Sequence, residues 1–259
     1  MTSHRQPALF AGHGSPMYAI EPNRFTDAWS TFGKSLQRPD AVLVISAHWL
    51  TRGVWVTAMS RPKTVHDFTG FSDKLHAFEY PAPGSPALAD RVQELLNLPI
   101  VLEENEWGLD HGAWSVLKYL YPHADVPVVQ LSLDASLSAA EHYDLAKRLR
   151  PLRDENILIV ASGNVVHNLQ AMDWQEDLEP YKWAQAFNDL FISEISSHHH
   201  ENLIYWKRYG DAALLSIPSP EHYWPALYTL ALQEENEHAT VLINGLVMRS
   251  ISMLSFTIQ

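Results

Sequence analysis

The stretch Ala41-Val42-Leu43-Val44-Ile45-Ser46-Ala47 indicates the fold class most directly. It is an apolar run rich in β-branched side chains, which is the pattern of a strand buried on both faces. Two later runs, Pro127 to Leu133 and Ile157 to Ala161, have the same character. Strands of this kind occur in parallel sheets whose two faces are covered by helices, so we expect such a sheet at the centre of the molecule.

Helical patterns separate these strands. The segment from Asn23 to Gln37 carries apolar residues three and four positions apart, and Ser138 with Glu141 forms a capping box for a helix to Leu149. Two further helices are expected from Ser85 to Leu96 and from Pro180 to Ser197, and an antiparallel edge from Thr240 to Thr257. The alternation predicts an α/β fold, a single-domain α/β/α sandwich around a mixed, largely parallel central sheet, over residues 1–259.

Composition narrows the function classes. The 259 residues include 18 Lys+Arg and 30 Asp+Glu, for a formal net charge of −12, and no cysteine. An acidic chain without a basic patch is a poor partner for nucleic acid or an anionic membrane. The lack of cysteine excludes disulfides, thiolate-bound zinc, iron–sulfur clusters and a thiol nucleophile.

The N-terminal residues and the lengths of the apolar runs indicate the cellular compartment to expect. The N-terminal Met1-Thr2-Ser3-His4-Arg5 lacks the apolar core of a signal peptide, and no apolar run approaches the ~20 residues that span a bilayer. We therefore expect a cytoplasmic protein. The C-terminal edge strand could pair with another subunit, so a homo-oligomer is possible and the oligomeric state stays open.

Three of the 14 histidines follow expected strands directly: His13 in Gly12-His13-Gly14, His48 after Ala47, and His167 shortly after Ala161. Ligands of open α/β sheets bind beyond the carboxyl ends of the strands, and parallel strands place those ends at one edge. We therefore expect the three imidazoles to converge. The glycines beside His13 free the backbone there and leave space around the ring.

Two further histidines are candidates, and the rest carry less weight. His111 lies in a glycine-flanked loop, and His222 lies in a turn before a helix that ends at Leu232. The run at 198–200 is expected to be a solvated helix end. Surface positions are expected for His4, His76, His123, His142 and His238.

A long segment, residues 60–84, holds three prolines and two glycines and is expected to form a functional loop, such as a lid or a binding wall. It contains His66 beside Asp67, which makes His66 a candidate substrate contact. Among the nine tryptophans, Trp49 and Trp224 are the candidates for lining a site because each lies close to a candidate histidine.

Several catalytic motifs are absent from the sequence: the G-x-S-x-G elbow, the Walker A loop, G-x-G-x-x-G and H-E-x-x-H. Without cysteine, any metal must be held by histidines, carboxylates and water. Two classes of function stay open from these residues. One is a zinc-dependent hydrolase that uses metal-bound hydroxide, and the other is a non-enzymatic metal-binding or interaction protein on the same scaffold.

Five motifs together resemble one known family. They are Gly12-His13-Gly14-Ser15-Pro16, Ser46-Ala47-His48-Trp49, Gly108-Leu109-Asp110-His111-Gly112-Ala113-Trp114, Ser162-Gly163-Asn164 with His167-Asn168, and Pro220-Glu221-His222-Tyr223. The set resembles the class III extradiol ring-cleavage dioxygenases, and within them the 4,5-DOPA extradiol dioxygenase branch. The motifs recur in order over nearly the whole chain.

The resemblance implies a mononuclear non-haem Fe(II) site that opens a catechol, DOPA or a similar small compound, with O2. It implies that His13, His48 and His222 hold the metal. His167 would be the acid/base residue and a possible fourth ligand, and His111 would contact substrate or oxygen. Protocatechuate-cleaving relatives use two histidines and a glutamate, which leaves Glu221 as an alternative to His222. An all-histidine site also suits Zn(II).

Overall fold

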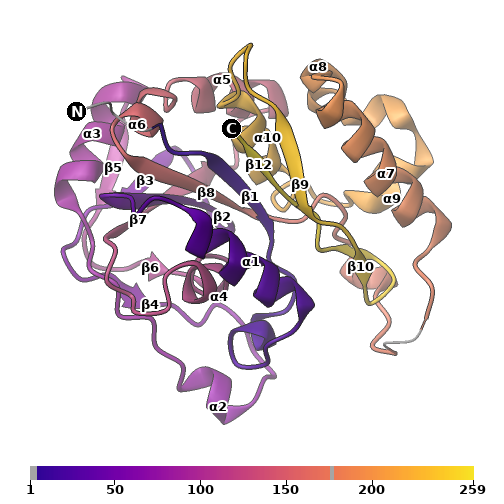
Figure 1. Ribbon diagram of the computed structural model, residues 1–259, viewed down its shortest axis with the longest axis horizontal. Helices are drawn as coiled ribbons and strands as arrows, with labels where there is room; N and C mark the ends of the chain where they lie inside the picture. Colours follow the sequence, from indigo (N-terminus) through magenta and orange to yellow (C-terminus); the bar gives the residue numbers. More distant parts are fainter. Residues whose placement is uncertain (1–4, 176–177) are drawn as a thin grey trace.

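The structure is a computed structural model that describes residues 5–175 and 178–259. An eight-stranded sheet crosses its centre in the order β5-β3-β7-β2-β8-β1-β12-β9 (Figure 1). Its strands are β1 (Ala8–Gly12), β2 (Ala41–Thr51), β3 (Val54–Thr57), β5 (Ile100–Glu103), β7 (Val128–Asp134), β8 (Ile157–Gly163), β9 (Ala239–Ile243) and β12 (Ser255–Ile258).

The middle of the sheet is parallel. Strand β8 pairs in parallel with both β1 and β2, and β2 pairs in parallel with β7. Antiparallel pairs, β3 with β7 and β12 with both β1 and β9, extend the sheet on the two sides. The predicted mixed, largely parallel sheet is confirmed, and the carboxyl ends of β1, β2 and β8 lie at one edge.

Helices cover both faces of this sheet. Adjacent residues of β2 point to opposite faces of the sheet. Leu43 packs in the hydrophobic core on one face, and Val44 packs in the core on the other. The first face carries α3 (Pro86–Leu96), α5 (Ala139–Lys147), α6 (Pro151–Asp154), α7 (Lys182–Ser196), α8 (His200–Ile204), α9 (Asp211–Ser216) and α10 (Trp224–Ala231). The second face carries α1 (Arg24–Ser35) and α4 (His111–Leu120) (Figure 1).

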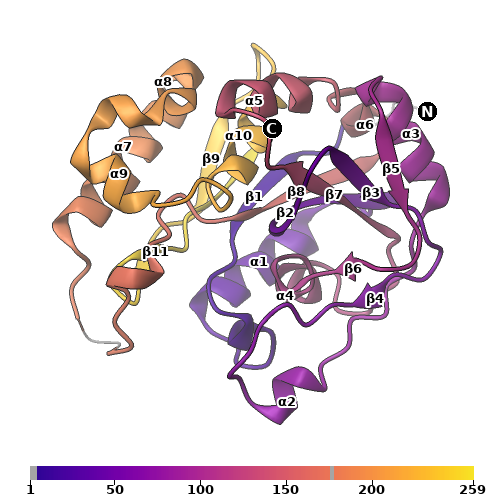
Figure 2. The same cartoon turned by 180° about the vertical axis from the view of Figure 1, so that it is seen from behind.

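Smaller elements complete the described chain. Outside the central sheet lie two short strand pairs, β4 (Lys63–Thr64) with β6 (Gly108–Leu109) and β10 (Leu246–Val247) with β11 (Ile251–Ser252), and helix α2 (Asp73–His76) (Figure 2). The short 3-10 helices are η1 (Pro16–Ala19), η2 (Leu169–Ala171) and η3 (Trp206–Tyr209). No helix in the described ranges has the length and apolar character needed to cross a membrane.

The capping signals confirm the predicted helix starts. Ser138 accepts from the backbone N–H of Glu141, while the Glu141 carboxylate accepts from the Ser138 backbone. Asn23 and Ser85 begin α1 and α3 in the same way, by accepting hydrogen bonds from first-turn N–H groups. Each bond satisfies a backbone donor that the helix itself cannot pair.

Two local predictions need correction. Strand β2 does not end at His48-Trp49, as expected; it continues to Thr51, and its pairing with β7 shifts register between Ile45 and Leu50. His48 therefore lies at an irregularity within the strand, which is a common means of re-aiming a side chain. His111 is not in a loop but is the first residue of α4, because Asp110 caps the helix by accepting from the N–H of Ala113.

Candidate functional site

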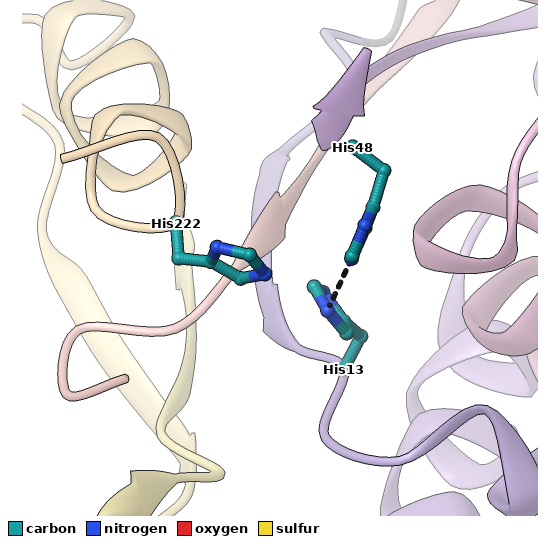
Figure 3. Close-up of side chains that lie close together, drawn as sticks. All are labelled: His13, His48 and His222. Atoms are coloured by element: carbon teal, nitrogen blue, oxygen red, sulfur yellow. Dashed lines mark hydrogen bonds between the residues drawn. The ribbon is translucent and has the colours of Figure 1, made fainter. Parts of the chain in front are cut away.

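Three histidines from distant parts of the chain meet at the carboxyl edge of the sheet. His13 follows β1, His48 lies in β2, and His222 precedes α10 (Figure 3). Each offers one nitrogen, and these atoms lie within 4.8 Å of one another. The Nε2 atoms of His13 and His48 are 3.1 Å apart. Two nitrogens bound to one metal at ~2.1 Å lie about 3.0–3.4 Å from each other, so the spacing fits a shared ion.

The hydrogen bonds of His13 determine its tautomer. Nδ1 of His13 lies 3.0 Å from Oγ of Ser162, and that hydroxyl donates its proton to the carbonyl of Gly112 at 2.6 Å. Because a hydroxyl has one proton to give, it must accept from Nδ1–H of His13. Nε2 of His13 therefore carries the lone pair and faces the other two imidazoles.

His48 and His222 also have their Nδ1 atoms next to a hydrogen-bond acceptor. Nδ1 of His48 lies 3.1 Å from Oδ2 of Asp67, and Nδ1 of His222 lies 3.2 Å from Oε1 of Glu221. Each carboxylate can only accept, so both Nδ1 atoms donate and both Nε2 atoms are free to bind a metal. Metal-binding histidines commonly donate their second nitrogen to a carboxylate or another acceptor in this way. The set suits the metals that prefer imidazole, iron and zinc among them.

The close approach of the Nε2 atoms of His13 and His48 favours a proton or a metal ion between them. Burial, and then the neighbouring His48 and His111, lower the pKa of His13 well below its usual range. Burial alone would also lower the pKa of His48, but its hydrogen bond with Asp67 and the charge of Asp110 raise it. Two lone pairs 3.1 Å apart repel each other, and either a proton on His48 or a metal ion removes that repulsion.

His111 and His167 flank this trio on different sides. The His111 ring lies 3.8 Å from that of His48, whereas the His167 ring stacks on that of His222 at 3.5 Å and 5°. Burial, followed by the charge of His48, lowers the pKa of each to about 4. Both are therefore neutral near pH 7. Among the described residues, His167 belongs to neither group whose ligand atoms lie close enough to share a metal.

The second such group is His48, Asp67 and His111. The closest atoms of this group are already hydrogen-bonded to one another. Oδ2 of Asp67 accepts from Nδ1 of His111 at 2.9 Å and from Nδ1 of His48 at 3.1 Å. A metal there would have to displace both protons. The trio, whose Nε2 atoms have no such partner to give up, is the better candidate metal site.

A cavity of about 280 Å³ opens beside the trio. Its histidine wall is formed by His13, His48, His111, His167 and His222. The remaining wall is largely apolar and consists of Gly14, Ser15, Pro16, Phe68, Phe71, Leu169, Met172, Trp174, Met248 and Ile251. A mostly apolar cavity with a few convergent polar groups is typical of small-molecule sites.

The other predicted contacts lie elsewhere. Nε2 of His66 faces the carbonyl of Phe78 at 2.9 Å, and the ring packs near Phe68, so His66 lies behind the cavity wall. Trp49 is 4% exposed and stacks on Trp107. Trp224 packs against His142 at a ring distance of 4.4 Å. These three residues are absent from the described lining of the cavity.

The expected surface histidines also need one correction. His142 is fully buried, where Nδ1 lies 3.1 Å from the hydroxyl of Tyr228. His76, His123 and His238 are not buried. His4 lies outside the described residues.

Sequence reasoning missed two carboxylates that organise the site. Asp67 contacts both His48 and His111, and Asp110 accepts from Oγ of Ser46 at 2.7 Å. Asp110 is completely buried, which raises its pKa to about 6. The only sequence signal for Asp67 was its position in the long 60–84 segment, which supplies Phe68 and Phe71 to the cavity wall.

Gly163→Ala is expected to disturb the metal site from its supporting backbone. A methyl group at Gly163 would lie 2.2 Å from the carbonyl oxygen of His222, which also accepts from the N–H of Asn164 at 2.8 Å. The segment carrying His222 must shift, so we expect a stability loss of ~1–3 kcal/mol and weaker metal binding. Urea denaturation and metal titration measure the two effects. Unchanged metal affinity would show that the site tolerates the shift.

The buried histidines predict acid sensitivity of the metal-free protein. Burial lowers the pKa of six described histidines: His13, His111, His142, His167, His200 and His222. Below the unfolded histidine pKa near 6.5 the unfolded chain binds more protons than the folded chain, whose pKa is about 4 for His111, His142, His167 and His200. The unfolding free energy therefore decreases as the pH falls from 6.5 towards 4.

Asp110 opposes this effect, because its raised pKa lets the folded state take up a proton, but it is one group against six. The stabilising contribution of His48, whose pKa is raised, is lost only as pH rises. We therefore expect a net loss of several kcal/mol between pH 6.5 and 4 in urea denaturation with a chelator present. A pH-independent unfolding free energy over that range would contradict it.

Comparison with known proteins agrees with this geometry. Residues 2–240 match the family described as the catalytic LigB subunit of aromatic ring-opening dioxygenase. The chain is 49% identical over 263 residues to a 4,5-DOPA dioxygenase extradiol of Escherichia coli K12, covering 100% of this chain and 96% of that protein. It is 37% identical to a Beta vulgaris protein of the same name, covering 92% and 90%.

A solved structure shares the fold. The crystal structure of an uncharacterized protein from Escherichia coli K12 superimposes with a TM-score of 0.86 at 45% identity and covers 98% of this chain and 100% of that one. The five motifs, the sheet and these matches lead to one assignment. The chain belongs to the LigB family of aromatic ring-opening dioxygenases and is an extradiol catechol dioxygenase of the 4,5-DOPA dioxygenase branch.

Proposed function

We propose that the chain is a metal-dependent enzyme that opens a small catechol with O2, using Fe(II) held by His13, His48 and His222. The observation that carries the proposal is the donor set: three imidazoles with their Nδ1 atoms held by acceptors and their Nε2 atoms free. Zn(II) would bind the same nitrogens. When bound, Fe(II) supplies the redox chemistry with O2, which Zn(II) cannot supply.

The reaction needs groups that accept and return protons beside the catechol. Nδ1–H of His111 is committed to Asp67, so Nε2 of His111 is a lone-pair acceptor in a neutral ring that lines the cavity. His167 is also neutral and lines the cavity beside His222. We assign His167 as the acid/base residue that takes a hydroxyl proton and returns it, and His111 as a contact to substrate or oxygen.

The products follow from the balance of atoms. One ring bond breaks, between a hydroxyl-bearing carbon and its neighbour outside the diol. One atom of O2 enters a new carboxylate and the other a new carbonyl group, giving a yellow semialdehyde. The catechol supplies the electrons, so no further reductant is consumed.

Cavity size and relatives indicate the substrate class. A cavity of about 280 Å³ lies at the small end of ligand sites and suits one aromatic ring with a short side chain. Phe68 and Phe71 offer faces against which that ring can pack. Because two relatives are named for 4,5-DOPA, we propose DOPA or a similar small catechol.

We also propose that residues 1–259 act as one catalytic domain. The proposed metal ligands support it, since His13 follows β1 near the start of the chain and His222 precedes α10 near its end, yet both lie at the same edge of one sheet. No ligand set would be complete with either end of the chain removed.

The test compares metals under matched conditions. Metal-free protein is loaded anaerobically with Fe(II), with Zn(II) or with nothing, and is then mixed with DOPA, caffeate or protocatechuate in air. We expect O2 uptake and a yellow product only with Fe(II). Full iron loading without O2 uptake for any of the three catechols would overturn the proposal.

A further inference from the structure

We propose that Asp67 is a positioning residue. It fixes the orientation and the tautomer of two imidazole rings, those of the proposed metal ligand His48 and of the cavity residue His111. The inference rests on the proposed metal site. Asp67 binds neither metal nor substrate in this account. It acts by holding the protons of two imidazoles on their Nδ1 atoms, which leaves both Nε2 atoms free for chemistry.

The contacts of Asp67 are shared between its two carboxylate oxygens. Oδ2 accepts from Nδ1 of His111 at 2.9 Å and from Nδ1 of His48 at 3.1 Å. Oδ1 accepts from the backbone N–H of His111 at 3.0 Å. Asp67 thus holds the first residue of α4 by backbone and side chain and ties it to the middle of β2.

Three N–H donors, two from imidazole rings and one from the backbone, surround the Asp67 carboxylate, and an ionised carboxylate can only accept. Its side chain is only 13% exposed, so water competes little for these bonds. A carboxylate with three donors and little solvent is well placed to hold the imidazoles in one orientation.

The same residue connects the metal site to the cavity wall. Asp67 is followed by Phe68, whose ring lies 5.6 Å from that of His111 in an edge-on arrangement and which lines the cavity. The 60–84 segment therefore contributes a wall residue and, one position earlier, the acceptor that orients a metal ligand. Disturbing Asp67 should affect metal binding and substrate binding together.

Asp67→Asn tests whether Asp67 acts as a hydrogen-bond acceptor or only fills space. The asparagine amide has nearly the same shape as the carboxylate, but it has one acceptor oxygen in place of two. If that oxygen accepts from the imidazoles, the NH2 group faces the backbone N–H of His111. If it accepts from the backbone instead, the NH2 group faces both Nδ1–H groups. At least one of the three bonds is lost, and an imidazole can adapt only by moving its proton to Nε2.

The experiment measures metal affinity and imidazole tautomers. Co(II) titrations of the otherwise wild-type chain should show affinity reduced by about 10- to 100-fold in Asp67→Asn. Nitrogen-15 NMR of the metal-free protein should show changed ring-nitrogen signals for His48 or His111, from a moved proton or from the weaker acceptor. The matched control is Asp73→Asn, the same chemical change at an exposed position of the same segment, where we expect less than about a twofold effect.

The outcomes are distinct. Co(II) affinity in Asp67→Asn equal to that of Asp73→Asn would overturn the proposal. Reduced affinity with no change in the nitrogen-15 signals of His48 and His111 would overturn it as well, because the effect would then come from displacement of the segment. Neither readout depends on ring opening, so a wild-type protein that binds metal but opens no catechol would reject the proposed function and leave this inference standing.

Discussion

Replacing His13 with alanine is expected to weaken metal binding by about 10²- to 10³-fold. Binding free energies of ~10–16 kcal/mol for four-ligand zinc sites correspond to roughly 2.5–4 kcal/mol per ligand, which gives that range. His13 offers Nε2 to the shared centre because Ser162 holds its other nitrogen. Metal titration followed by determination of bound iron measures the loss, and ring opening should fall with it.

The control for this variant is a histidine away from the site. His123→Ala changes an exposed residue and should keep wild-type affinity. Because His13 is 1% exposed, His13→Gln serves as a larger replacement that fills more of the space, and thermal denaturation checks that both variants fold. Wild-type iron content in a folded His13→Ala protein would remove His13 from the ligand set.

Replacing His167 with alanine is expected to lower kcat by about 10²- to 10⁴-fold, the usual contribution of a positioned acid or base. Metal content should stay near wild type, since His167 stacks on His222 and lies outside the group that shares the ligand centre. Single-turnover kinetics with saturating catechol and O2 measure the chemical step. Bound iron is determined on the same samples.

Two results would change the role of His167. Loss of iron from His167→Ala would make the residue a ligand. Full iron content with unchanged turnover would remove it from catalysis and leave His111, with its Asp67 partner, as the base. His123→Ala, at an exposed position away from the cavity, is the control and should alter neither quantity.

The sheet and its helices could be predicted because their signals are local. The apolar, β-branched run that begins at Ala41 and the capping box at Ser138 each decide their own element. The meeting of His13 and His48 could also be predicted, because parallel strands place their carboxyl ends at one edge. The lengthened β2 could not, since the register shift before Leu50 depends on its neighbour β7.

The supporting residues of the site depend on contacts that periodicity does not encode. Asp67 reaches His111 across 44 positions through an irregular segment with few regular hydrogen bonds. His142 was expected at the surface from its polar neighbours, yet α5 turns it into the core against Tyr228 and Trp224. Trp49 lies next to a metal-site histidine in sequence but points away, because successive residues of a strand face opposite sides.

The central claim is that this chain inserts both atoms of O2 into an opened catechol ring at an iron held by histidines. Mass spectrometry of the product formed from DOPA by the Fe(II)-loaded protein under ¹⁸O2 tests it most directly. We predict a ring-opened product with one labelled atom in the new carboxylate, and the second in the new carbonyl group when that group is trapped by reduction before its oxygen exchanges with water. An unlabelled product, or one in which the ring is intact, would contradict the account.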